Sequence, residues 1–212
     1  MPAGLLTHAG HAYGARDRCT LDALFAETAA RLHTARKALA VPNLPSESWQ
    51  LSVGDTPTCS KAELVGVDEV RPGNFVFYDL MQLEIGSCAE TDLAAAVACP
   101  VVGRYPDRRE LVVHGGAVHL AKEALTDSDG QPWYGGLGTI GEQRFGPLLP
   151  DVRVVSLAQE HGVIAVPDGE SHRQVTALVP GDVVLIFPVH SCLTCDLFDR
   201  YLALDGTEIP RR

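Results

Sequence analysis

A histidine and a cysteine two positions apart are the residues of this sequence best suited to binding a metal ion. His190 and Cys192 follow the apolar run 183–187, within the segment 189–195 that reads Val-His-Ser-Cys-Leu-Thr-Cys. In an extended segment, side chains two residues apart point to the same side, so both could reach one ion. Imidazole nitrogen and thiolate sulfur together suit zinc, and only two ligands would leave positions open, as in a catalytic site.

The same segment also has a structural interpretation. A buried histidine hydrogen-bonded to the backbone beside a buried cysteine would give the same His-x-Cys spacing, which is common. Cys195 could join the ion, but its direction depends on a turn that the sequence does not define. The spacing alone leaves both interpretations open. The remaining cysteines are expected to be reduced thiols rather than a disulfide framework: Cys19, Cys59, Cys88 and Cys99.

Two glycine-containing loops carry groups that could hold a phosphate. Residues 54–58 read Gly-Asp-Thr-Pro-Thr and residues 71–74 read Arg-Pro-Gly-Asn. Glycine lets the backbone approach an anion closely, and threonine hydroxyls and backbone N–H groups can then donate to it. Barrels of parallel strands commonly bind phosphate at such strand ends. Each loop could equally be an ordinary turn, so the sequence leaves open whether the loops bind phosphate.

Two further polar clusters are less specific. His8, His11 and Tyr13 follow the first expected strand, where they could stack on a ring or hold the polar atoms of a cofactor. They could equally be core and rim residues. Glu160 and His161 lie between two expected strands, and a hairpin turn explains them without any function.

The elements that must position these residues change character along the chain. In the first part we expect a strand over 4–9, a helix from an N-cap at Thr20 to Ala40, and strands over 49–53 and 75–78. Strands separated by a helix or a long crossover predict a parallel α/β unit. A complete (β/α)₈ barrel takes about 250 residues, so residues 1–79 are expected to form an incomplete barrel fragment.

From residue 80 the pattern becomes mostly β. A helix is expected over 89–98, followed by short β-rich runs separated by Pro-Gly-Asp and Asp-Gly turns. The runs are 101–103, 111–113, 152–157, 163–166, 183–187 and 201–204. They predict a compact antiparallel β domain over 80–212, either a sandwich or a partial barrel. The fold class is therefore α/β followed by mostly β.

Composition narrows the class of partner. The chain has 212 residues, with 17 Lys and Arg against 27 Asp and Glu, and a net charge of −10. A nucleic acid or an anionic membrane would require a basic surface, so neither is expected as a partner. The apolar stretches near 93–102 and 183–189 are shorter than the ~20 residues of a membrane helix. The first residues show no basic leader, and we expect a cytoplasmic protein.

Taken together, the motifs resemble one family: D-serine dehydratase and D-threonine aldolase, which are fold type III pyridoxal-phosphate enzymes related to alanine racemase. The matching pieces occur in the family order and extend over essentially the whole chain: Thr7–Tyr13, Val53–Thr58, Glu69–Asp79, Gln159–Gly162, and Pro180–Asp182 through His190–Cys192. Each piece is modest alone, but five in register are specific.

The resemblance implies a barrel that holds pyridoxal 5'-phosphate, followed by a β domain that supplies metal ligands. The cofactor-binding residues it implies here are Tyr13, Gly54, Thr56, Gly73 and Asn74. Tyr13 would contact the pyridoxal ring, and the others would hold the phosphate. His190 and Cys192 would bind zinc. The resemblance also implies a small D-amino acid as substrate and a homodimer for the full-length enzyme.

A cysteine as the second metal ligand favours the dehydratase branch, because aldolase members of the family usually have an aspartate there. The implied reaction converts D-serine to pyruvate and ammonia, with the metal acting as a Lewis acid on the departing hydroxyl. The alternative within the family is retro-aldol cleavage of D-threonine or another D-3-hydroxy amino acid.

One departure from the family concerns lysine. The Schiff-base lysine of the family lies on the first barrel strand, in an N-terminal part that this sequence does not contain. The lysines present are Lys37, Lys61 and Lys122, and none is expected on a strand entering the cofactor site. We therefore expect a C-terminal portion that is inactive alone, and we assign it no catalytic residue. The alternative outside the enzymes is a non-catalytic remnant that binds a metal or a cofactor.

Overall fold

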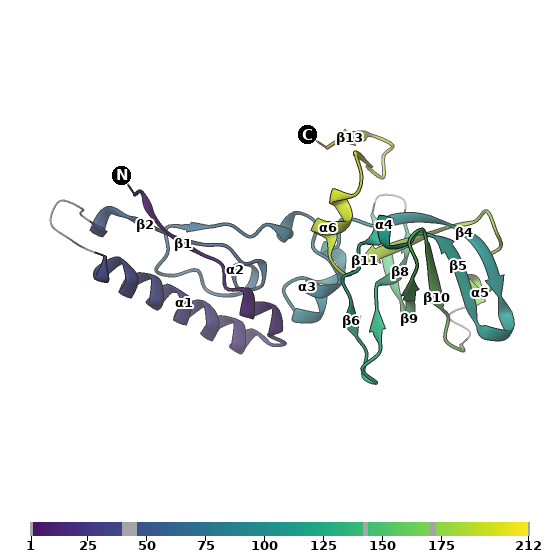
Figure 1. Ribbon diagram of the computed structural model, residues 1–212, viewed down its shortest axis with the longest axis horizontal. Coiled ribbons are helices and arrows are strands. Elements are labelled where there is room, and N and C mark those ends of the chain that lie inside the picture. The colour runs from purple at the N-terminus through teal and green to yellow at the C-terminus, as the bar shows by residue number, and fades with distance from the viewer. Residues whose placement is uncertain (1, 40–45, 142–143, 170–172, 212) are drawn as a thin grey trace. The chain divides into compact units, whose positions relative to one another are not determined.

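The computed structural model describes residues 2–39, 46–141, 144–169 and 173–211 of the chain (Figure 1). The chain divides into two compact units. The first, here called the parallel unit, comprises the described residues of 1–76 and 82–89. The second, the barrel unit, comprises 77–81 and the described residues from 90 onward. The division between residues 79 and 80 that the sequence suggests for the family's domains stays a prediction.

The parallel unit contains a three-stranded parallel sheet. Its strands are β1 (Gly4–Thr7), β2 (Gln50–Val53) and β3 (Glu69–Val70), in that order across the sheet. Leu5 of β1 pairs with Leu51 of β2, and Val53 pairs with Val70 of β3. This is the parallel α/β arrangement that alternating strand and helix patterns predict. The sheet therefore brings the ends of β1 and β2, and the loops that follow them, to one edge.

Helix α1 (Arg18–Ala38) lies beside β1 and β2 (Figure 1). It begins two residues before the predicted cap at Thr20, because the Asp17 side chain caps it instead. Asp17 accepts hydrogen bonds from the Thr20 amide at 2.8 Å and the Thr20 hydroxyl at 2.7 Å. The predicted end at Ala40 lies outside the described residues. The face of the helix that packs inward buries these residues: Leu21, Phe25, Thr28, Ala29 and Leu32.

The segment that follows the second glycine loop differs from the prediction. Residues 75–78 form no strand; a 3-10 turn covers Asn74–Val76, and Tyr78 adopts a left-handed conformation with φ 47°. Phe75 and Val76 are exposed, so their β propensity finds no sheet neighbour to pack against. The chain then enters helix α3 (Leu80–Ile85).

The prediction of a helix over 89–98 is also wrong. A 3-10 turn at Glu90–Asp92 precedes strand β4 (Val97–Tyr105), whose first residues pair with strand β11 (Val183–Pro188). Ala98, for example, lies opposite Leu185. Sheet pairing with a distant segment therefore overrides the helical tendency of the alanines.

The barrel unit is a closed antiparallel barrel of six strands. Besides β4 and β11, it uses β5 (Glu110–His114), β8 (Gly135–Ile140), β9 (Phe145–Leu157) and β10 (His161–Ala165). Their order is β10-β5-β4-β11-β8-β9, closing from β9 back to β10. The sequence predicts an antiparallel domain of this kind, as a sandwich or partial barrel; the structure closes it. Closure leaves every one of these strands with two neighbours.

Short elements complete the barrel unit. Two small antiparallel pairs join β6 (Leu125–Thr126) to β7 (Pro132–Trp133) and β12 (Arg200–Leu202) to β13 (Glu208–Pro210). Its helices are α4 (Ala117–Leu120), α5 (Arg173–Thr176) and α6 (Ser191–Asp196). In the described part of the chain, no helix has both the length and the apolar run that crossing a bilayer requires.

Alternating residues of the barrel strands point inward and form one apolar core. Its buried members are Cys99, Val101, Leu111, Val113, Leu120, Leu137, Val152, Val154, Ile164, Val166, Val175, Val184 and Ile186. Packing is close enough that a Cβ added at Gly138 would lie 2.3 Å from the Phe187 ring. This filled interior holds β11 rigidly, and β11 leads directly into the segment with the predicted metal ligands.

Candidate functional site

The first group of predicted site residues lies where β1 and β2 end side by side. The Gly54 amide donates to the Thr7 carbonyl at 3.0 Å, and His8 Nδ1 donates to the Gly54 carbonyl. The His8 and Tyr13 rings stack, with centroids 5.9 Å apart and 25° between their planes. Tyr13 is thus connected through His8 to the first glycine loop. His11, from the same cluster, is exposed.

The start of helix α2 (Thr56–Lys61) brings the two glycine loops together. Asp55 caps this helix by accepting from the Thr58 amide at 2.8 Å and the Thr58 hydroxyl at 2.7 Å. Thr56 is buried, and its Oγ1 accepts a hydrogen bond from the Asn74 amide at 3.1 Å. Because Oγ1 is the acceptor there, Thr56 keeps its own O–H to donate.

Arg71 fixes the edge of the sheet beside these loops. Its Nε donates to Ser52 Oγ at 2.7 Å, and its guanidinium also donates to the Thr7 carbonyl at 3.1 Å. A Cβ added at Gly54 would lie 2.7 Å from that guanidinium, so Gly54 lets Arg71 pass.

Gly73 is different, since a Cβ there would meet nothing within 4 Å. Hydroxyl and backbone N–H donors in glycine loops, with open space at Gly73, fit a phosphate group.

Among the described residues, no lysine lies on the sheet of the parallel unit. Lys37 is near the end of α1, Lys61 is the last residue of α2, and Lys122 lies between α4 and β6 in the barrel unit. All three lysines therefore lie outside the strands of the described structure.

The predicted metal ligands stand at the start of α6. His190 has an extended backbone (φ −129°, ψ 107°), and the helix begins at the next residue, so Cys192 is helical. The argument that both side chains share one side of an extended segment is therefore wrong beyond His190. The chain turns because α6 begins at Ser191, only three residues after β11 ends at Pro188. The two residues are still neighbours on one short turn; the His190 side chain is 23% exposed and Cys192 is exposed.

A buried carboxylate that sequence reasoning did not assign holds His190. Asp79 Oδ2 lies 3.2 Å from His190 Nδ1, and it accepts a hydrogen bond from the Ser191 amide at 2.9 Å. The nearby Asp79 carboxylate raises the pKa of His190; burial opposes this, and the charge of Glu123 adds to the rise. Asp79 ends the motif Glu69–Asp79, which was the only signal of it in the sequence.

The two cysteines of this segment differ in environment. Burial, and next the negative charge of Asp79, raise the pKa of Cys192 above its ordinary value. Burial raises the pKa of Cys195 to about 11, with a smaller contribution from Cys192. Cys195 is a buried residue whose carbonyl accepts a hydrogen bond from the Tyr201 hydroxyl at 3.2 Å. The greater exposure of Cys192 therefore favours it over Cys195 as a ligand, although a bound metal must displace its proton.

The donor chemistry around His190 fits a metal ion with open positions. With Nδ1 facing Asp79, Nε2 is the nitrogen left for a metal, and a thiol stands two residues away. Within the ranges that the structure describes, no group of three or more His, Cys, Asp and Glu side chains could hold an ion together. The pair therefore fits a site that other groups complete and does not fit a closed structural zinc site.

Three histidines gather elsewhere in the barrel unit, where the sequence predicted only a turn. The His114 ring lies with its centroid 4.8 Å from that of His119 and 5.9 Å from that of His161. Burial lowers the pKa of His119, the neighbouring His114 lowers it further, and Glu160 opposes the shift. The distance between these residues in the sequence hid the cluster, because the pairing of β5 with β10 places His114 opposite His161.

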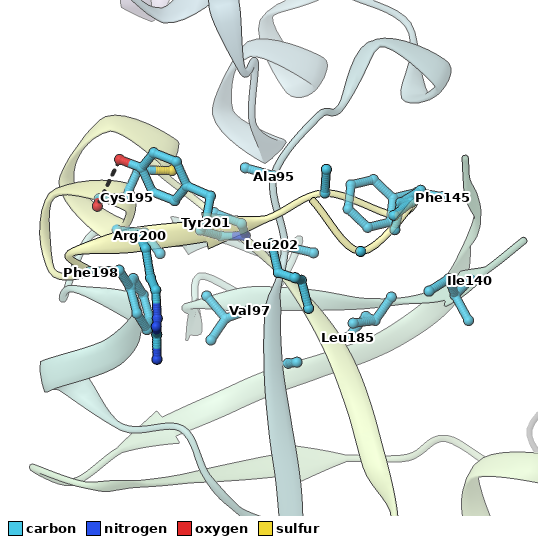
Figure 2. Close-up of a pocket in the computed structure, with 17 residues that line it drawn as sticks. Ala95, Val97, Ile140, Phe145, Leu185, Cys195, Phe198, Arg200, Tyr201 and Leu202 are labelled. Carbon is cyan, nitrogen blue, oxygen red and sulfur yellow. Dashed lines mark hydrogen bonds between the residues drawn. The ribbon is translucent and has the colours of Figure 1, made fainter. Parts of the chain in front are cut away.

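The barrel unit also contains an apolar cavity of about 470 Å³ under the segment that carries β12. Figure 2 shows Leu202 pointing toward Val97 and Leu185, with Phe145 at one end and Tyr201 beside Cys195 at the other. Neither His190 nor Cys192 lines this cavity.

Comparison with known proteins places the chain in a family. A family model described as "Putative serine dehydratase domain" matches residues 94–204, which is more than half of the 212 residues. The chain belongs to the serine dehydratase domain family. The matched region is the greater part of the barrel unit of this serine dehydratase domain protein, and it includes His190 and Cys192.

Similarity to two named dehydratases extends beyond the barrel unit to the parallel unit. The chain is 35% identical over 208 residues to D-threo-3-hydroxyaspartate dehydratase of Delftia sp. strain HT23, a match that covers 96% of this chain and 53% of that enzyme. It is 32% identical over 210 residues to D-serine dehydratase of Dictyostelium discoideum, covering 96% and 51%. The chain thus spans about half the length of the curated relatives it matches.

Solved structures agree on the fold. An alanine racemase-like protein of Idiomarina loihiensis matches 98% of this chain and 54% of its own, with a TM-score of 0.81 and 28% identity. The Delftia dehydratase gives a TM-score of 0.78 and 30% identity over 98% of this chain and 54% of that chain. D-threonine aldolase of Filomicrobium marinum, at 20% identity and a TM-score of 0.64, shares the fold. The chain therefore has the alanine racemase-like fold.

Two solved variants of D-threo-3-hydroxyaspartate dehydratase bear on the metal. One is a cysteine-to-alanine variant in the metal-free form, and the other is a histidine-to-alanine variant. In that enzyme the altered histidine and cysteine stand two residues apart in the same order, which is the spacing of His190 and Cys192.

Proposed function

We propose that this chain is the C-terminal portion of a D-amino-acid lyase dependent on pyridoxal 5'-phosphate and zinc, most like D-serine dehydratase. Its parallel unit would be part of an incomplete (β/α)₈ barrel. The names of the relatives, which are dehydratases of D-serine and of a D-hydroxyaspartate, support a D-3-hydroxy amino acid as the substrate class. The homodimer and the cytoplasmic location stay predictions.

The observation that carries the proposal is the grouping of Asp79, His190 and Cys192. A histidine held at Nδ1 by a carboxylate is the usual environment of a metal-bound imidazole. A cysteine two residues on repeats the spacing of the residues changed in the two D-threo-3-hydroxyaspartate dehydratase variants, one of which is in the metal-free form. His190 and Cys192 would hold zinc through nitrogen and sulfur, and solvent, substrate or other residues would complete it.

The parallel unit would hold the other cofactor. Thr56, Gly73 and Asn74, with Gly54 in the same loop, would bind the phosphate, and Tyr13 would lie against the pyridoxal ring. When bound, pyridoxal phosphate supplies an electron sink at the substrate Cα, and zinc supplies a Lewis acid for the departing hydroxyl. The chain's own part is to position these groups: Arg71 and Asp55 fix the loops, and Asp79 fixes His190.

The lysine that forms the covalent link with pyridoxal phosphate in this family would come from outside this sequence. Lys37 and Lys61 are helical, and Lys122 lies in the barrel unit between α4 and β6. We therefore propose that the chain alone has no lyase activity. In an enzyme completed with an N-terminal half, D-serine should give pyruvate and ammonia, whereas an aldolase would give glycine and an aldehyde from D-threonine.

Zinc binding by the purified chain tests the proposal without relying on activity. We expect close to one zinc ion per chain after loading and desalting, measured by elemental analysis. Cys192→Ala should remove most of this zinc, because the thiolate is one of two protein ligands. Cys195→Ala is the matched control and should retain it, since the Cys195 side chain is buried.

Two results would contradict the proposal. One is a wild-type chain that binds no zinc at micromolar metal, and the other is equal loss of zinc in the two cysteine variants. Melting temperatures of both metal-free variants show whether either substitution has simply unfolded the barrel unit.

A further inference from the structure

Asp79 is the one fully buried carboxylate that faces a predicted metal ligand in the described residues. Its side chain has 0% exposure, and it belongs to the barrel unit although it lies 111 positions before His190. Burying a carboxylate costs several kcal/mol unless hydrogen bonds satisfy it, so its partners indicate why it is there.

Three contacts of this carboxylate are with the turn that carries the metal pair. Oδ2 accepts from the Ser191 amide at 2.9 Å, lies 3.4 Å from Ser191 Oγ, and lies 3.2 Å from His190 Nδ1. A carboxylate can only accept, so this close approach favours a proton on Nδ1, although the pair does not reach full hydrogen-bond geometry. In neutral imidazole the lone pair then lies on Nε2, the nitrogen that would bind a metal.

The backbone holds Asp79 in this place from both sides. The Phe77 carbonyl accepts from the Ala94 amide at 2.8 Å, and the Met81 amide donates to the Val189 carbonyl at 3.2 Å. The second bond ends one residue before His190. Between these two anchors Tyr78 adopts a left-handed conformation (φ 47°), which a tyrosine rarely takes without a compensating arrangement around it.

We propose that Asp79 is a positioning residue that holds His190 with its proton on Nδ1 and its Nε2 available to the metal. This inference rests on the proposed function, because it assigns a role in the same zinc site. The competing explanation is structural: Asp79 would only cap α6 through the Ser191 amide, and the state of the imidazole would not depend on it.

The state of the His190 ring in the metal-free chain separates these explanations. A ¹⁵N-labelled chain at mildly alkaline pH should show His190 protonated at Nδ1, with the signal assigned by its loss in His190→Gln. Asp79→Asn keeps the shape of the side chain and removes its charge, and it should shift the imidazole toward the Nε2–H form. A cap acting only on Ser191 would leave the ring unchanged.

Zinc affinity gives the second measurement. Asp79→Asn should weaken zinc binding about 10- to 100-fold, as removal of a carboxylate partner from a metal-bound histidine commonly does. Ser191→Ala is the matched control, because it removes only the longer 3.4 Å contact and leaves the amide in place. Its affinity should stay within about twofold of wild type.

The outcomes distinguish this inference from the proposed function. If the wild-type chain binds no zinc, the proposed function fails. If it binds zinc but wild-type His190 is protonated on Nε2, or Asp79→Asn binds zinc as tightly as wild type, the positioning role alone is wrong. The wild-type spectrum needs no aspartate variant, so the inference can be overturned even if Asp79→Asn does not fold.

Discussion

The parallel unit ends its sheet at β1 and β3, whereas the barrel unit closes its sheet on itself. Each barrel strand has hydrogen-bonded neighbours on both sides and packs against a core of 13 buried residues. Among the described residues, the corresponding cluster of the parallel unit contains Phe25, Leu32, Leu51 and Val53, and Leu21 and Trp49 are buried outside it. The two candidate sites therefore stand on supports of very different size, and a larger buried apolar core means greater local stability.

The difference shows in how each unit fixes its site residues. In the parallel unit, polar contacts join one loop to another, such as His8 to the Gly54 carbonyl and Asn74 to Thr56. In the barrel unit, β11 leads from the packed core directly to His190, and one buried carboxylate orients the ring. We infer that the phosphate loops depend on a hydrogen-bond network, while the metal pair depends on the barrel core.

Core substitutions in each unit should have the largest effect and should test whether the units are independent. Ile186→Ala in β11 and Leu51→Ala in β2 each remove a buried side chain, and each should cost about 2–5 kcal/mol of its own unit's unfolding free energy. Native-state hydrogen exchange should show the loss in β4 and β11 for the first and in β1 and β2 for the second. In the wild-type chain the barrel strands should be the better protected.

The matched control is Leu6→Ala in β1, because Leu6 is 73% exposed and its loss should change stability by no more than about 0.5 kcal/mol. Loss of protection throughout the chain from either core variant would contradict the comparison, since the two units would then unfold as one.

Two buried thiols extend the comparison to alkaline pH. Burial raises the pKa of Cys99, in the barrel core, to about 12. A raised folded-state pKa contributes stability that is complete below the unfolded value of 9.0 and is lost as pH rises toward 12. Denaturant midpoints measured from pH 8 upward should therefore fall less steeply in Cys99→Ala than in wild type.

Cys59 in α2 provides the counterpart from the parallel unit. Burial and the charge of Asp55 raise the pKa of Cys59, and hydrogen bonds oppose this rise. Cys59 is only partly buried. Cys59→Ala should therefore change the slope of stability against pH less than Cys99→Ala does. Parallel slopes for wild type and Cys99→Ala would mean that the barrel interior admits water to this thiol.

Sequence reasoning identified the parts of this fold whose signal is local. The alternation of strand and helix predicted the parallel pairing of β1 with β2, and the short β runs predicted the antiparallel unit. It was wrong at 75–78, where a strand was predicted, and at 89–98, where a helix was predicted. In both segments the neighbours available for pairing, rather than intrinsic propensity, decide the structure. The sequence also did not predict that the barrel closes, because closure depends on the pairing between β9 and β10.

For the sites, the sequence supplied residues but not their supports. The loops with Thr56 and Asn74 were predicted together, and the structure joins them by a hydrogen bond. Asp79 could not be assigned, since nothing local to it indicates that it will face a turn more than a hundred positions later. The extended geometry assumed for Cys192 was wrong because helix α6 begins one residue earlier.

Alanine substitutions at two glycines of the parallel unit should change stability least. They should also distinguish a glycine that supports the fold from one that leaves space for the phosphate. Gly54→Ala places a Cβ 2.7 Å from the Arg71 guanidinium, which must move away from Ser52 and Thr7. Losing such a hydrogen bond typically costs about 1 kcal/mol. Gly73→Ala meets open space, so its stability should stay within about 0.5 kcal/mol of wild type.

The binding of pyridoxal 5'-phosphate, followed by the absorbance of the cofactor during titration, should respond differently. If phosphate occupies the open space at Gly73, the added methyl group takes up that space, and Gly73→Ala should weaken binding although the unit remains as stable as before. Inorganic phosphate should compete with the cofactor in wild type and less in the variant. Unchanged binding by Gly73→Ala would place the phosphate elsewhere and leave the contact between Thr56 and Asn74 a purely structural one.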